Sequence, residues 1–189
     1  MAKYILTTLL ILCLSSFLLA ETNAKLTKLE IVDSEECIFI GKSIIIGNGN
    51  NEAGALWGKC WEDGTFETLE KQKGKLLDGV YSDLTYGVKE DGTFTYMVGM
   101  FMKKGALVPK GFTSYKIPVG KMVKACIYGE EAQIHSNAET IINTELKEKG
   151  YKADNFMAKV YTCEGFATPK SEGKTLVTID FCCGVTKSD

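Results

Sequence analysis

Arginine is missing from this sequence, so all 22 basic residues are lysines, against 24 acidic residues. Arginine is the side chain that most often grips phosphate or carboxylate groups through two parallel hydrogen bonds, and its absence argues against a dedicated phosphate site. The formal net charge is −2, and no basic face is indicated. We therefore expect no nucleic-acid partner.

Histidine and the common catalytic motifs are also scarce. His135 is the single histidine, it is expected at the surface, and it has no obvious serine or cysteine partner for a catalytic triad. CxxC pairs, phosphate-binding loops and dinucleotide-binding fingerprints are absent from the sequence. We accordingly expect no metal, no cofactor and no assignable catalytic residue, and a non-enzymatic role is favoured over an enzymatic one.

The longest apolar run lies close to the N-terminus. Lys3 precedes an apolar segment over residues 4–19, and small residues near Ala20 and Ala24 then suit a signal peptidase. The run is short for a membrane span, and polar residues follow it at once. The pattern predicts a signal peptide over residues 1–24 and a secreted or periplasmic protein without a stable membrane anchor after cleavage. An uncleaved anchor is the alternative.

Six cysteines would remain after that cleavage, and an even number in an exported chain favours disulfides. Cys182 and Cys183 are adjacent in a predicted strand, so their side chains point to opposite faces. We predict at least one disulfide that involves one of these two, with a set of free buried thiols as the alternative. The six are Cys37, Cys60, Cys126, Cys163, Cys182 and Cys183.

The remaining residues, 25–189, suit one domain with its core over about 36–185. Alternation of apolar side chains predicts strands, and Gly99 stands in the middle of the most regular one, where a backbone or ligand can approach closely. The segments follow a β-α-β-β order twice, which predicts an α+β fold with an antiparallel sheet and helices on one side. The predicted strands are 38–46, 81–89, 94–102, 121–128, 155–162 and 175–183, with helices from about 52 and over 130–149.

Four short pieces, in this order and spacing, carry a family resemblance. They are Tyr86-Gly87, the strand start 94–99, the turn 108–112 and the segment 117–121. Together they resemble the GyrI-like small-molecule-binding domain, also known as the effector-binding domain of some bacterial transcription regulators. The resemblance extends loosely over 38–185 and implies the same fold, with an organic ligand held at the open face or cleft between the two halves. Because the predicted signal leads almost directly into the domain, no DNA-binding module is expected.

The resemblance also indicates a ligand site and one departure from the family. In the family, the next-to-last strand often carries Phe-Glu-x-Tyr, whose glutamate pairs with cationic ligands and serves catalysis in members that hydrolyse cyclopropane-bearing compounds. Here Tyr161 matches the tyrosine, but Lys159 replaces the glutamate, which favours neutral or anionic ligands over cations. The alternative for Lys159 is a solvent-facing edge position. The residues expected to line the site are Trp57, Trp61, Tyr86, Tyr96, Lys159 and Tyr161.

The leading hypothesis is an exported protein that sequesters, carries or senses an aromatic or apolar organic molecule. A hydrolase of reactive, cyclopropane-bearing natural products on the same fold is the second hypothesis. A protein-binding inhibitor is the third, so a protein partner is kept as an alternative to the small organic ligand.

Overall fold

The computed structural model describes residues 24–47, 49 and 52–188. The predicted signal peptide lies outside this part of the chain except for Ala24, which is buried. Within it, no helix is both long and apolar enough to cross a membrane.

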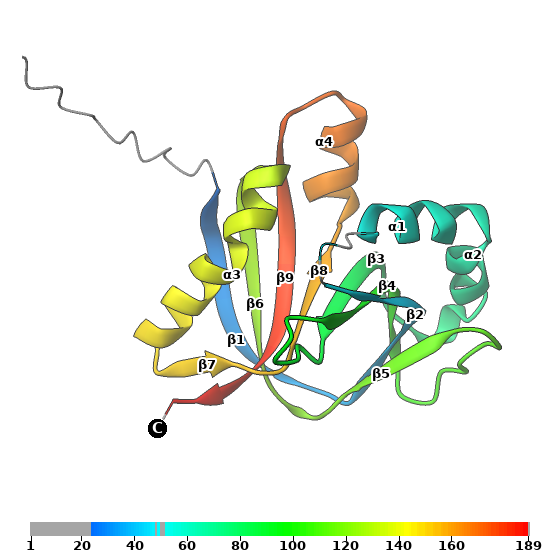
Figure 1. Ribbon diagram of the computed structural model, residues 1–189, viewed down its shortest axis with the longest axis horizontal. Coiled ribbons are helices and arrows are strands. Elements are labelled where there is room, and N and C mark those ends of the chain that lie inside the picture. The colour runs from blue at the N-terminus through cyan, green and yellow to red at the C-terminus, as the bar shows by residue number, and fades with distance from the viewer. Residues whose placement is uncertain (1–23, 48, 50–51, 189) are drawn as a thin grey trace, which may run out of the picture.

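One antiparallel sheet of nine strands forms the framework (Figure 1). Its strands follow the spatial order β1-β6-β9-β8-β3-β4-β2-β5, and the short β7 pairs with β9. The strands are β1 (Lys25–Ser34), β2 (Cys37–Ile46), β3 (Leu76–Tyr86), β4 (Phe94–Lys103), β5 (Thr113–Ile117), β6 (Gly120–Glu130), β7 (Tyr151–Ala153), β8 (Phe156–Val160) and β9 (Leu176–Lys187).

The sheet contains the predicted β-α-β-β unit twice. In the first half, β2 and β3 flank β4, and in the second half β6 and β8 flank β9. The halves meet where β3 pairs with β8. The α+β prediction is thereby confirmed. The helical segments are α1 (Ala53–Glu62), α2 (Thr65–Glu70), η1 (Lys73–Lys75), α3 (Glu131–Glu148), the π-helical turn η2 (Cys163–Ala167) and α4 (Thr168–Ser171).

Helices cover one face of the sheet in two separate places (Figure 1). In the second half, α3 packs on β6 and β9 through Ile134, Ile142 and Leu146, which form one stripe along the helix with a 3.6-residue period. In the first half, α1 and α2 pack on β2 and β4 through Leu56 and Phe66, among others. Between the two helical layers lie β3 and β8, where the halves join.

The opposite face has its own apolar core without a covering helix, formed by side chains such as Phe39, Met97 and Phe101. Gly41 and Gly99 pair directly across β2 and β4. A Cβ atom on Gly99 would lie 2.0 Å from the carbonyl oxygen of Ile40, and one on Gly41 would be equally close to Val98. The predicted close approach at Gly99 is confirmed, and the approaching group is the backbone of the neighbouring strand.

Two strands and the disulfide depart from expectation. The polar edge strand β1 begins before the predicted core, and β5 is a short edge strand after the turn at Pro109. All six described cysteines are free, so the predicted disulfide is not found. In the sheet, Cys182 lies opposite Lys124 and Ala158 and Cys183 lies opposite Val123, so neither is the register partner of another cysteine.

Candidate functional site

A buried ion pair marks the junction of the two halves on the helix-bearing face. Asp83 of β3 and Lys159 of β8 are direct partners in the strand register. Lys159 Nζ lies 3.4 Å from Asp83 Oδ1, and the side chains of the two residues are 23% and 1% exposed, respectively. A buried carboxylate requires compensation by charge or hydrogen bonds, and the surrounding residues supply both.

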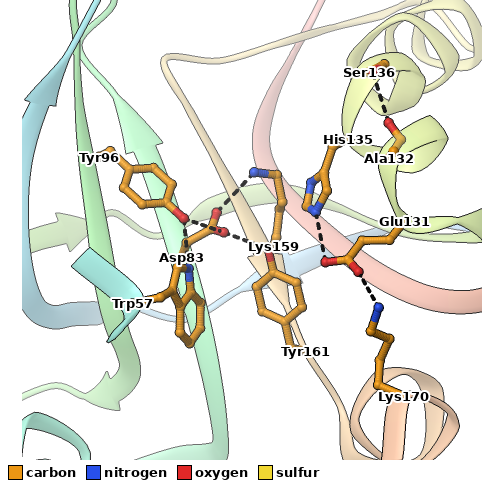
Figure 2. A network of polar contacts seen from close by, with 10 residues as sticks. All are labelled: Trp57, Asp83, Tyr96, Glu131, Ala132, His135, Ser136, Lys159, Tyr161 and Lys170. Carbon is orange, nitrogen blue, oxygen red and sulfur yellow. Dashed lines mark hydrogen bonds and ion pairs between the residues drawn. The ribbon is translucent and has the colours of Figure 1, made fainter. Parts of the chain in front are cut away.

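Two tyrosine hydroxyls hold the other carboxylate oxygen (Figure 2). Tyr96 and Tyr161 both donate to Asp83 Oδ2, at 3.0 Å and 2.7 Å, and Trp57 Nε1 donates to the Tyr96 hydroxyl at 2.9 Å. Burial, and next the charge of Asp83, raise the pKa of Tyr96 and of Tyr161 far above the usual tyrosine range. Both phenols are therefore neutral donors, and neither can act as a base near pH 7.

Lys159 lies among aromatic side chains as well as beside the carboxylate. Its ammonium is 6.0 Å from the centroid of the Tyr96 ring, and Trp57 and Tyr161 meet edge to face at 5.3 Å. Within the described part of the chain, Asp83 Oδ1 accepts no hydrogen bond, so the ion pair with Lys159 is its contact. Lys159 thus occupies the position between a carboxylate and a ring that a cationic ligand would favour.

A second polar group approaches the pair from α3 (Figure 2). His135 Nε2 lies 3.8 Å from Glu131 Oε1, and Lys170 pairs with the other oxygen of Glu131 at 2.8 Å. The side chain of His135 is 35% exposed and the residue as a whole is exposed, in agreement with its expected surface position. Burial, and next the charge of Lys159, lower the pKa of His135, which keeps its imidazole neutral near pH 7.

The structure brings together four of the six predicted site residues, namely Trp57, Tyr96, Lys159 and Tyr161. Together with Asp83 we call these residues the central cluster. Trp61 lies apart from it, 50% exposed and packed against Phe66 and Tyr81.

Tyr86 lies on the opposite face of the sheet, where its ring centroid is 4.3 Å from that of Tyr115. Strand alternation explains this placement, because Tyr86 is out of phase with Asp83 on β3. Asp83 itself was not anticipated, although an acidic residue inside an apolar predicted strand is a signal that could have identified it. Across the described residues, no group of histidine, cysteine and acidic side chains is arranged to hold a metal ion.

The fold and the junction define a class of α+β domains in which two β-α-β-β units share one sheet. The chain belongs to the GyrI-like small molecule binding domain family, whose model matches residues 27–180. No curated protein matches the sequence.

Solved structures share the fold at low sequence identity. The structure of SAV2435 bound to tetraphenylphosphonium aligns with a TM-score of 0.60 at 11% identity, over 84% of this chain and 94% of that one. A putative transcription regulation protein from Staphylococcus aureus gives 0.58 at 12% identity, over 84% and 98%. A hydrolase encoded by lin2189 from Listeria innocua gives 0.51 at 10% identity, over 84% and 92%.

Proposed function

We propose that this protein is exported and binds an aromatic or apolar organic molecule at the central cluster, which allows it to sequester, carry or sense that molecule. The observation that carries the proposal is the set of aromatic side chains around a paired charge at the junction of the two halves of the sheet. Tyr96 is buried, and Trp57 and Tyr161 are partly buried. Flat aromatic walls with a few fixed polar groups are typical of small-molecule sites. The binding of tetraphenylphosphonium by SAV2435, which has the same fold, is consistent with this class of ligand.

The ion pair sets the expected charge preference of the site. A cationic ligand would have to displace the Lys159 ammonium from Asp83, and the lysine would then lose its partner at a partly buried position. A neutral ligand leaves the pair intact, and an anionic ligand adds a second contact to Lys159. We therefore expect neutral and anionic aromatic molecules to bind more tightly than cations of the same shape.

Tetraphenylborate and tetraphenylphosphonium test this preference, because they are alike in size and shape and opposite in charge. Titration followed by intrinsic tryptophan fluorescence, to which Trp57 and Trp61 both contribute, should show tighter binding of the borate. Lys159→Met leaves Asp83 unpaired and should reverse the order, and Lys159→Glu should also shift the preference toward the cation. We expect each change to amount to roughly tenfold to a hundredfold in affinity, the worth of one charged contact in a partly dry site.

Matched variants separate the contribution of the aromatic stacking surface from the contribution of the Lys159 charge. Trp57→Ala should weaken the binding of both ions, because it removes stacking area. Calorimetry measures this affinity, since the tryptophan in the site is lost. Lys147→Met on the exposed side of α3 should change neither. If the wild type binds the cation tightly and neither change at Lys159 alters the ratio, the ligand does not meet Lys159 and the site is wrongly assigned.

Export is tested separately. The support is Lys3, the apolar run after it and the small residues that follow. Mass spectrometry of the protein from its native host should find an N-terminus at residue 21 or 25. Intact Met1 or Ala2 in the soluble fraction would contradict export without affecting the ligand site.

A hydrolase is the second candidate, and Asp83 is the observation that favours it. Its Oδ1 accepts no hydrogen bond within the described structure, so this oxygen could act on a substrate if Lys159 moved away. Turnover of an electrophilic ester or strained-ring substrate, lost in Asp83→Asn, would support hydrolysis. Binding without turnover would support the leading proposal.

A further inference from the structure

The sheet face opposite the helices carries a groove that is separate from the central cluster. Its volume is about 760 Å³, and it runs over β6, β9 and β8 between β1 on one side and the start of β3 on the other. Pockets of roughly 300–1,000 Å³ are the usual size for small-molecule ligands. Apolar side chains form much of its surface, including Val32, Cys37, Phe101, Met122, Val160 and Cys182.

Most of the charged residues that line the groove are already satisfied by neighbours. Lys28 pairs with Glu30 at 3.0 Å, and Glu36 pairs with Lys104 at 2.7 Å. Asp33 also lines the groove and pairs at 2.9 Å with Lys121, which does not line it. The internal charges of the groove are therefore largely neutralised in pairs.

Asp78 and Asp180 also line the groove. The Val80 N–H donates to Asp78 Oδ1 at 3.1 Å. Asp180 lies beside the Cys126 thiol, and burial together with the neighbouring carboxylate raises the pKa of that thiol to about 11. Asp78 also lies within electrostatic reach of Lys124.

Lys124 differs from these residues. Among the charged groove residues that the structure describes, Lys103, Lys124, Glu35 and Asp180 have no side-chain hydrogen bond or ion pair, and Glu35 lies in the connection between β1 and β2. Lys124 stands in the middle of β6, on the same side as Met122 and Cys126. It lies directly opposite Cys182 on β9 and Glu30 on β1, and the Glu30 carboxylate pairs with Lys28 instead. A cation that forms no ion pair within 4 Å therefore projects into a groove whose surface is largely apolar.

We propose that this groove is a second ligand site, which takes a free monocarboxylic acid with an apolar chain or ring and holds its carboxylate on Lys124. Charge complementarity carries the choice, because an apolar body suits the walls and one anionic group suits the unmatched ammonium. The site is independent of the function proposed for the central cluster, since none of its lining residues belongs to that cluster.

Displacement of 11-(dansylamino)undecanoic acid, followed by dansyl fluorescence, tests the second site. Decanoate should displace the probe at a concentration at least about tenfold lower than methyl decanoate, since a hydrogen bond to a charged group contributes that much. Lys124→Gln should bring the two competitors to within about twofold to threefold of each other on the same scale. Lys147→Gln, on the exposed side of α3, should leave the ratio unchanged.

Three results would overturn the proposal: no binding of the probe to the wild-type chain, equal displacement by the acid and its ester, or decylammonium competing better than decanoate. A ratio that persists in Lys124→Gln but disappears in Trp57→Ala would move the binding to the central cluster. Circular dichroism and thermal unfolding of Lys124→Gln confirm that the variant is folded, and Lys124→Arg, which keeps the charge, should retain a preference for the acid.

Discussion

The two halves of the sheet share one backbone plan and differ in what fills it. The second half has a single helix of 18 residues whose buried stripe is aliphatic, including Ile134, Ile142 and Leu146. The first half has two short helices, and its core holds aromatic and methionine side chains such as Phe66 and Met100. The repeat thus preserves the strand pairing, but the core side chains differ. They are mainly aliphatic in the second half and include more aromatic and methionine side chains in the first.

Neither half contains the central cluster by itself. Asp83, Tyr96 and Trp57 come from the first half, and Lys159 and Tyr161 from the second. The cluster exists because β3 pairs with β8 in a register that sets Asp83 against Lys159. Changes that damage one half should therefore act on stability and on ligand binding in different proportions.

The largest effect is expected at the glycine pair of the first half. Gly99→Ala would place a Cβ atom 2.0 Å from a backbone oxygen, which side-chain motion cannot relieve. We expect the free energy of unfolding to fall by about 3 kcal/mol or more, or the variant to be insoluble. Gly120→Ala in β6 is the control, because no atom lies within 4 Å of the added Cβ. Urea unfolding that finds the two variants equally stable would contradict the close approach of β2 and β4.

The next effect separates the two helical layers. Ile142→Ala in α3 should lower the free energy of unfolding by about 2–5 kcal/mol, because Ile142 is fully buried and leaves a cavity. Its affinity for tetraphenylborate should stay close to that of the wild type. Trp57→Ala should show the opposite balance, with a large loss of affinity for a smaller loss of stability, since Trp57 is only partly buried. If both variants lose affinity and stability in the same ratio, the packing of α3 also shapes the ligand site.

Periodicity was sufficient to predict most of the framework from sequence. The alternation in residues 94–102 and the helical stripe along α3 are dense, so the two β-α-β-β units were recognisable. The edge strands were not, because β1 is largely polar and β5 has five residues after a proline-containing turn. Their pairing depends on partners distant in sequence, such as Lys25 with Tyr128, which local patterns do not report.

The site was predictable only as far as the family pattern reached. Lys159 and Tyr161 were identified through it, but the same pattern also placed Tyr86 in the site, and Tyr86 lies on the other face of the sheet. Asp83 could not be paired with Lys159 in advance, because the register between β3 and β8 is a tertiary property. The sequence alone thus indicated an unpaired lysine, and the fold shows a neutralised one.

A smaller effect concerns the stability of that pair. Asp83→Asn removes the charge partner of Lys159 and weakens two hydrogen bonds from tyrosine, so it should cost about 1–3 kcal/mol in urea unfolding. Tyr161→Phe should cost less, about 1 kcal/mol, because one of the two donors to Asp83 remains. If Asp83→Asn is as stable as the wild type, the charge of Asp83 does not stabilise the fold. The cluster then contributes to ligand binding rather than to the stability of the junction between the halves.

The smallest effect is expected at His135, where the second half approaches the charge pair. Its pKa is lowered in the folded protein, by burial and by Lys159, from the ordinary value of 6.5. Below that value the unfolded chain binds more protons than the folded one, so stability should fall as the pH decreases from about 7 to about 5. His135→Gln cannot take up the proton and should flatten this slope by less than about 1 kcal/mol, because solvent screens a side chain that is about one-third exposed. Chemical unfolding at several pH values measures the difference, with Glu131→Gln as the companion variant. Because the Glu131 carboxylate favours the protonated imidazole, its removal should steepen the slope, and a flatter slope in Glu131→Gln would mean that His135 is charged in the folded state.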